Sequence, residues 1–151
     1  MIMDTVPSLA AGERTAALDR ICHDFNVDLL YAFGSRAREA LGWMHSEIDM
    51  LALGPSDLDI GVKAARGHVL KVWAKVRLAD AIEQLFGVTR VDLVCLEDAD
   101  PFLAANIIRG ERLYAVDLRL AYEYDLYILR RAGDLAPLER ERLRLIFEGS
   151  R

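Results

Sequence analysis

The chain has 151 residues, of which 53% are hydrophobic and 28% charged, and its formal net charge is −5. This length suits one folded domain with a single core and a helical addition. The negative charge argues against extended nucleic-acid binding, because proteins with that function present basic surface to the phosphates. No apolar run is long enough to cross a bilayer, and the N-terminus lacks a signal-peptide pattern. We therefore expect a cytoplasmic protein without a membrane-spanning segment.

Apolar residues recur along the chain with alternating helical and strand periodicity, which predicts an α/β (α+β) fold. In this fold a small mixed sheet is flanked by helices, and further helices form the C-terminus. The expected helices cover 9–25, 69–86 before the stop signal Gly87, 101–109 after the N-cap Asp100, and the tail from 117, broken near Gly133 and Pro137. The expected strands cover 28–33, 57–62 and 91–96. Trp73 falls on an apolar helical stripe, so we expect it in the core.

Segment 36–56 has helical spacing but is difficult to place as one helix. A straight helix from Arg36 to Leu53 would run roughly 27 Å. Residues 54–56 could return the chain by at most about 11 Å. If Ser35 and Asp57 share a site, the segment must fold back on itself. We therefore predict two short helical pieces with a hinge at Gly42.

Three aspartates are the strongest chemical signal in the sequence. Asp57 and Asp59 alternate with apolar residues on one strand, so both carboxylates leave the same face. Asp92 lies within Val-Asp-Leu-Val, which is typical of a neighbouring buried strand. Two such charges 4 Å apart repel by about 4 kcal/mol at an effective dielectric of 20, so a cation is expected among them. Oxygen ligands without His or Cys favour two magnesium ions, or manganese, which could bridge a triphosphate.

A second signal is a strand that ends at Gly34-Ser35 and leads into a helix. Backbone N–H groups at a helix start form a positive cradle for phosphate. Arg36 and Arg38 could add charge-assisted bonds to phosphate oxygens. A Gly-Ser pair alone is more often a plain turn, and an isolated Asp-x-Asp is more often solvated loop. The ordered combination of both signals indicates a nucleotide site.

In order and content, three runs resemble the minimal nucleotidyltransferases of the DNA polymerase beta superfamily. They are Tyr-Ala-Phe-Gly-Ser-Arg-Ala-Arg at 31–38, Ser-Asp-Leu-Asp-Ile at 56–60 and Val-Asp-Leu-Val at 91–94. Segment 107–117 also looks like the one that closes this domain. The resemblance implies a nucleotidyltransferase-like fold with a catalytic domain at 1–117 and a helical extension at 118–151 packed on it.

The resemblance also implies a function. Asp57, Asp59 and Asp92 would be catalytic metal ligands, with Asp92 nearest the attacking hydroxyl, while Gly34 and Ser35 would hold the triphosphate of ATP. Many such proteins look like the antitoxin half of a toxin–antitoxin pair. Their partner is a HEPN-type ribonuclease toxin, which they modify by moving AMP from ATP to a tyrosine hydroxyl.

Two departures from the family pattern leave alternatives open. Glu39 stands where the family usually has Gly, and 21 residues separate Ser35 from Asp57, which is longer than usual. A second acidic pair, Glu47 and Asp49, lies near the usual spacing. We prefer Asp57 and Asp59, because the other pair falls in a helical pattern where residues two apart diverge.

The function expected from these features is metal-dependent AMP transfer to a partner protein. One alternative is a catalytically weak antitoxin that neutralises its partner by binding. Another is a nucleotidyltransferase for a small molecule such as an antibiotic. The amphipathic end 138–147 could also support a homo-oligomer.

Overall fold

Strands and helices alternate along the chain in the computed structural model, which describes residues 11–52, 54 and 56–149. In that part of the chain, one sheet contains β1 (Val27–Phe33), β2 (Leu58–Ala64), β3 (Val91–Cys95) and β4 (Glu111–Ala115). Their spatial order is β3-β2-β1-β4, with β2 and β3 parallel and the other two pairs antiparallel. This mixed sheet confirms the predicted fold class, and the three predicted strands lie within two residues of their expected bounds.

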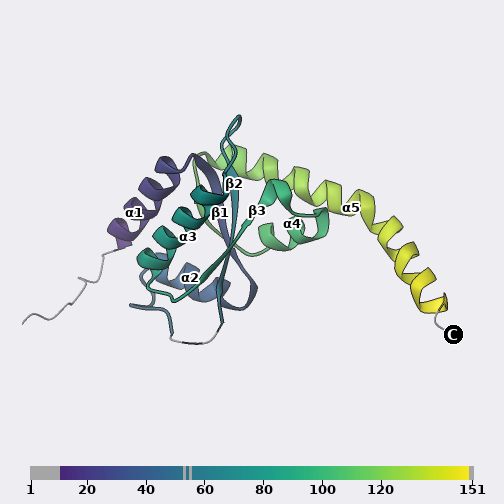
Figure 1. Ribbon diagram of the computed structural model, residues 1–151, viewed down its shortest axis with the longest axis horizontal. Coiled ribbons are helices and arrows are strands. Elements are labelled where there is room, and N and C mark those ends of the chain that lie inside the picture. Colours follow the sequence, from purple (N-terminus) through teal and green to yellow (C-terminus); the bar gives the residue numbers. More distant parts are fainter. Residues whose placement is uncertain (1–10, 53, 55, 150–151) are drawn as a thin grey trace, which may run out of the picture.

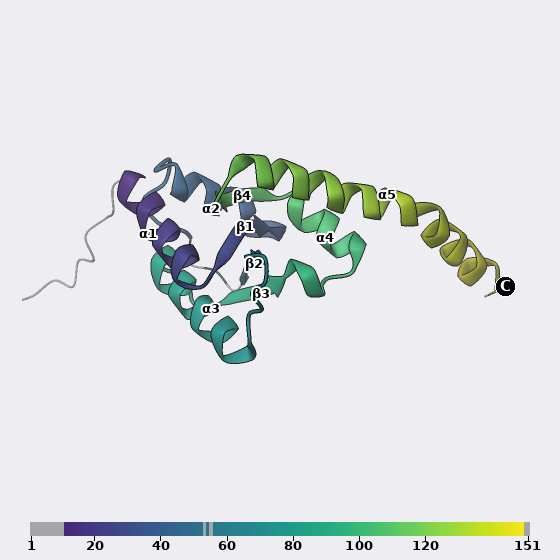
Figure 2. The ribbon, with the colours of Figure 1, turned by 90° about the horizontal axis from the view of Figure 1, so that it is seen from above.

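Helices cover both faces of the sheet (Figure 1). They are α1 (Ala11–Asp24), α2 (Ala37–Met44), α3 (Val72–Phe86), α4 (Pro101–Ile108) and α5 (Leu118–Gly149). Figure 2 shows α1, α2 and α3 on one face and α4 and α5 on the other. The core is divided accordingly, with Leu30 and Ile60 under the first group and Leu29 and Ile107 under the second.

Strand alternation in β2 determines which residues can form a site. Leu58, Ile60 and Val62 are fully buried toward α1, α2 and α3. The residues between them therefore project toward the side of α4 and α5. Gly61 is one of these, and a Cβ at this position would lie 2.4 Å from Cγ2 of Ile107, so the glycine allows α4 to approach the sheet. Asp59 projects from the same face.

The strand β4 was not predicted. Its sequence, Glu-Arg-Leu-Tyr-Ala, lacks the apolar alternation by which the other strands were recognised. All five residues are half-buried, so neither face of the strand is distinctly apolar. Backbone pairing with β1 supplies the missing signal, since Leu29 and Leu30 lie opposite Ala115 and Tyr114. A short edge strand of mixed polarity is therefore recognised from its backbone pairing and not from its sequence pattern.

The predicted break in the C-terminal tail was wrong, because α5 runs through Gly133 and Pro137 as one helix. Pro137 removes one helical hydrogen bond, and the ribbon bends in this region (Figure 1). Ion pairs beyond the proline, Arg142 with Glu139 and Arg144 with Glu141 and Glu148, support the final turns. No helix in the described part of the chain is sufficiently long and apolar to span a membrane.

The prediction of a buried Trp73 was also wrong, since this side chain is 61% exposed. The helix α3 begins at Val72 rather than at 69, and it buries Leu78, Ile82 and Phe86. Trp73 lies five residues before Leu78, which is about 140° around the helix and so on its outer side. Trp43, in contrast, packs against Phe86 and is only 5% exposed.

The prediction of two helical pieces in 36–56 failed as well. Among the residues of this segment that the structure describes, only α2 is helical beyond the short turn at Gly34–Arg36, and Gly42 lies buried inside α2 rather than at a hinge. Ser46 has a φ of 57°, which ends the helix. The buried Arg14 then donates to the backbone carbonyls of Trp43 and Ile48 at 2.6 and 2.9 Å. The following loop therefore obtains its order from a side chain of α1.

Candidate active site

The register of the two parallel strands places two of the predicted aspartates side by side. Asp59 of β2 and Asp92 of β3 are direct partners across the ladder. Neighbouring strands are about 4.8 Å apart, and partners in register project from the same face. Asp57 immediately precedes β2, two residues before Asp59. The sheet thus gathers all three carboxylates at one edge.

The predicted Gly-Ser turn lies directly against this cluster. Phe33, the last residue of β1, is the antiparallel partner of Asp59. Gly34 has a φ of 75°, and a Cβ at this position would lie only 2.5 Å from Oδ2 of Asp59. Gly34 is therefore required both by its backbone conformation and by the adjacent carboxylate. Ser35 follows in the same exposed turn.

The neighbouring carboxylates affect the pKa of Asp59. Burial raises the pKa of Asp59, and the charges of Asp92 and Asp57 raise it further. Asp57 forms an ion pair with Arg90, whose Nε lies 3.6 Å from Oδ2; the Arg90 side chain is exposed and that of Asp57 is half-buried. Arg90 was not anticipated, because nothing in the sequence distinguishes it from any surface arginine.

The donor set fits a hard divalent cation. Within the described ranges, no group of three or more His, Cys, Asp or Glu side chains is already arranged to hold a metal ion. To bind the ion, Asp57 would have to release Arg90. Exposed ion pairs contribute little free energy, so this exchange costs little. Three carboxylates on one sheet face, one of them with a raised pKa, supply the oxygen ligands that magnesium and manganese prefer.

The structure gives Arg36 a position inside the protein rather than at the open face of the turn. Its side chain is 8% exposed. The guanidinium donates to both carboxylate oxygens of Glu39 at 3.1 and 3.0 Å, and to the backbone carbonyls of Ala52 and Ser56. The residue predicted as a phosphate ligand thus holds the chain segment that leads into Asp57. Arg38, predicted for the same role, is exposed in the first turn of α2.

Glu39, which departs from the family pattern, is the second half of this connection. Its carboxylate accepts from Arg36 and also from the backbone N–H of Ala52 at 2.6 Å. The Arg36 guanidinium lowers the pKa of Glu39 below its usual range. The pair therefore ties the end of the long loop to α2, next to Ser35. The unusual residue and the unusual spacer are parts of one arrangement.

Glu39→Gln is expected to destabilise the fold by about 1 kcal/mol, because it removes the charge from a bidentate bond to Arg36. A lowered carboxyl pKa stabilises the fold above the unfolded value and loses that contribution as pH falls. The difference in free energy of unfolding between Glu39→Gln and wild type should therefore become smaller below pH 4.5. Denaturant unfolding across pH measures this. The control is Glu47→Gln, which changes an exposed carboxylate in the loop after α2. Equal effects from both variants would contradict the assignment.

The alternative acidic pair lies away from the sheet edge. Glu47 and Asp49 occupy the loop after α2, and both are exposed. They were predicted to lie on a helix, which is wrong, whereas their solvent exposure is confirmed. Neither residue belongs to a strand, so neither has a partner in register as Asp59 has in Asp92. This geometry supports the preference for Asp57 and Asp59.

Comparison with known protein families identifies the domain that carries the Gly-Ser turn and the paired aspartates. A sequence model of the polymerase beta nucleotidyltransferase domain matches residues 17–119. The chain therefore belongs to the polymerase beta nucleotidyltransferase family, and it is a nucleotidyltransferase. A search of curated protein sequences finds no match.

Several solved structures of toxin–antitoxin complexes contain a chain with the same fold. A chain from a mutant MntA–HepT toxin–antitoxin complex superposes with a TM-score of 0.63 at 19% identity, covering 91% of this chain and 98% of its own length. A toxin–antitoxin structure with AMP-PNP gives a TM-score of 0.63 at 20% identity, with the same coverage. The tri-AMPylated HEPN toxin of Shewanella oneidensis in complex with its MNT antitoxin gives 0.61 at 19%, covering 94% of this chain and 100% of that one. At these identities the likeness establishes the shared fold.

Proposed function

We propose that this nucleotidyltransferase moves AMP from ATP to a hydroxyl group of a partner protein, as the antitoxin of a HEPN-type toxin. The observation that carries the catalytic part is the pairing of Asp59 with Asp92 beside Gly34. The partner assignment is supported by the neighbouring structures, which are complexes of this kind, one of them with an AMPylated toxin. The cytoplasm, where ATP and such a toxin occur together, is the proposed location.

In this proposal, different residues of the site bind the triphosphate and the metal ions. Gly34 and Ser35 would receive the triphosphate, since their turn is exposed and opens toward Asp59. Asp57, Asp59 and Asp92 would hold two magnesium or manganese ions, which supply charge neutralisation for the triphosphate and its pyrophosphate leaving group. Arg38, which is exposed in the first turn of α2 directly after the Gly-Ser turn, is the remaining candidate for a phosphate contact.

The transfer exchanges one phosphorus–oxygen bond for another. The acceptor oxygen bonds to the α-phosphorus of ATP, the bond from that phosphorus to pyrophosphate breaks, and the hydroxyl proton is released. Asp92 is the exposed member of the trio, whereas Asp57 and Asp59 are half-buried. An acceptor that arrives from solvent therefore meets Asp92 first. We propose a tyrosine hydroxyl as the acceptor.

Two forms of labelled ATP test this function directly. The protein is incubated with magnesium, the toxin encoded beside it, and ATP labelled at either the α- or the γ-phosphorus. We expect label from the α-position on the toxin and none from the γ-position. Label from the γ-position would indicate phosphoryl transfer and contradict the proposal, as would the absence of both.

A binding-only antitoxin is distinguished by the Asp92→Asn variant. This exposed substitution should leave the fold intact while abolishing label transfer. If the variant still neutralises the toxin in cells as well as wild type does, occlusion is sufficient and catalysis is not the basis of neutralisation. If the variant loses both label transfer and neutralisation of the toxin, the result supports the enzymatic account.

A further inference from the structure

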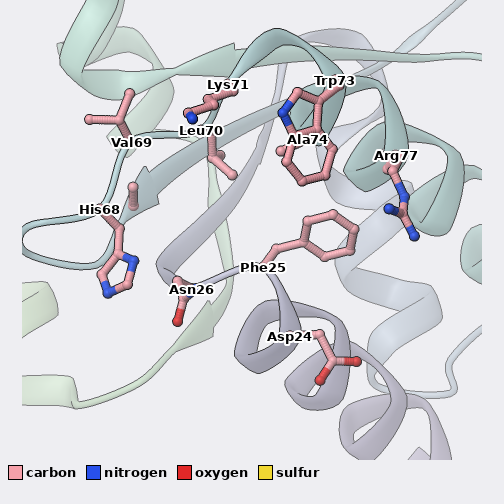
Figure 3. Close-up of a pocket in the computed structure, with 11 residues that line it drawn as sticks. Asp24, Phe25, Asn26, His68, Val69, Leu70, Lys71, Trp73, Ala74 and Arg77 are labelled. Atoms are coloured by element: carbon pink, nitrogen blue, oxygen red, sulfur yellow. The ribbon is translucent and has the colours of Figure 1, made fainter.

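A cavity of about 460 Å³ lies at the other end of the sheet from the carboxylates (Figure 3). Asn26 and Ala64, which line it, precede β1 and end β2, whereas Gly34 and Asp57 lie at the opposite ends of these strands. A seven-residue strand is roughly 23 Å long, so the two places are well separated. A molecule bound in this cavity leaves the nucleotide site open.

The lining of the cavity combines aromatic and cationic side chains. Phe25 comes from the turn between α1 and β1, and Trp73 from the first turn of α3. Figure 3 shows these two rings beside the cavity, with Arg77 at one end and His68 at the other. The Arg77 guanidinium lies 5.9 Å from the centre of the Trp73 ring. The cavity therefore offers an apolar wall together with positive charge.

Exposed apolar side chains continue outside the cavity along α3 and the segment before it. Val69 is 85% exposed, Val72 76%, Trp73 61% and Val76 57%. Isolated apolar residues are common on protein surfaces, but a contiguous group of large ones indicates an interaction site. We call Val69, Lys71, Val72, Trp73, Val76 and Arg77 the α3 surface.

The charge around the α3 surface is opposite to that of the whole protein. No acidic residue occurs between Asp59 and Asp80, although the chain has a net charge of −5. All three lysines of the sequence fall in this interval; Lys71 and Lys75 lie at α3, whereas Lys63 lies over the Tyr124 ring on the opposite face of the sheet. Lys75 is paired with Asp98, and Asp24 is the acidic residue among those that line the cavity. The exposed α3 surface is thus basic as well as apolar.

We propose that the α3 surface binds an acidic amphipathic helix of a partner protein, which places a large apolar side chain next to Trp73 and Phe25. A small molecule confined to the cavity would leave Val72 and Val76, which lie outside its lining, in water. Nucleic acid would gain stacking on Trp73 but nothing from the aliphatic residues. An acidic helix satisfies both features, because its apolar stripe covers the valines while its carboxylates meet Lys71 and Arg77.

Trp73 itself can report this interaction. Trp43 is buried, so iodide quenching of the free protein should act on Trp73. The probe is a tryptophan-free peptide with leucines at helical spacing and glutamates elsewhere, compared with the same peptide carrying lysines instead. The glutamate peptide should shield Trp73 from iodide and shift its emission to shorter wavelength. The lysine peptide should bind about tenfold more weakly, because its charges would repel Lys71 and Arg77 instead of pairing with them.

Charge reversal supplies the matched test. The double variant Lys71→Glu, Arg77→Glu should exchange the preference, binding the lysine peptide more tightly, while Arg20→Glu on α1 should leave the preference unchanged. Equal affinity for both peptides in the wild-type protein would overturn the proposal. Concentration-dependent shielding of Trp73 without peptide would also overturn it, since a second copy would then cover the surface. Neither readout depends on AMP transfer, so the proposal stands or falls independently of the proposed function.

Discussion

Asp59→Asn is expected to reduce AMP transfer by at least about 100-fold, because it removes a charged ligand from the proposed metal site. Asp59 is the residue on which the site converges, paired with Asp92 on one side and with Phe33 on the other. The substitution keeps the size and shape of the side chain. Transfer from ATP labelled at the α-phosphorus, measured under single-turnover conditions, checks the expectation.

The same substitution should not weaken the metal-free fold. Burial and the charges of Asp92 and Asp57 raise the pKa of Asp59, so the folded state disfavours its ionised form. At neutral pH the ionised carboxylate therefore costs stability, and that cost disappears as pH falls toward the unfolded value near 3.8. Asp59→Asn should thus be at least as stable as wild type at neutral pH. Marked destabilisation would indicate a structural role for Asp59 instead.

Asp49→Asn is the matched control for the choice between the two acidic pairs. Asp49 is an exposed aspartate of the loop that precedes β2, and the family spacing made it the competing ligand. We expect this variant to transfer AMP at the wild-type rate. If Asp49→Asn lost activity and Asp59→Asn retained it, the metal assignment would move to Glu47 and Asp49.

Gly34→Ala should reduce transfer by about 100-fold, comparable to displacing reacting groups by 1 Å. The new Cβ would approach Oδ2 of Asp59 to 2.5 Å, so either the turn or the carboxylate must shift. The left-handed backbone adds a cost of about 1–2 kcal/mol to folding. Both effects act at the point where the nucleotide turn meets the carboxylates. The steady-state rate and the midpoint of unfolding measure them separately.

Gly87→Ala separates backbone strain from the clash. Gly87 ends α3 with a φ of 69°, close to the 75° of Gly34, but a Cβ there has no atom within 4 Å. It should therefore destabilise the fold without reducing transfer by the remaining folded protein. If both glycine variants lost activity in proportion to their stability, the contact between Gly34 and Asp59 would have no specific role.

The predicted strands and the site were accessible from sequence because they depend on short-range alternation. Asp59 and Asp92 each lie among apolar residues of a strand, Asp57 directly precedes one, and the order of the motifs indicated that the strands adjoin. The parallel register of Asp59 with Asp92, however, follows from how α3 returns the chain, which no local pattern states. The position of Gly34 against Oδ2 of Asp59 is likewise a tertiary contact.

The errors in the predicted loop and in the last helix each have a physical explanation. Ile48 and Leu51 have helical spacing, yet they reach the core from a loop whose carbonyls are bound by Arg14 and Arg36. Two buried or nearly buried arginines thus replaced the expected helical bonds. In the loop, long-range side-chain contacts therefore override the local helical signal. The last helix, α5, continues across Pro137, and ion pairs lie in the turns beyond it.

Manganese binding tests most directly whether the carboxylates form a cation site. Free manganese is measured by electron paramagnetic resonance in the presence of a non-hydrolysable ATP analogue. Wild type and Asp49→Asn should bind manganese equally, whereas Asp59→Asn and Asp92→Asn should bind at least about tenfold more weakly. Manganese affinity that is the same in all four proteins would contradict the assignment of these aspartates.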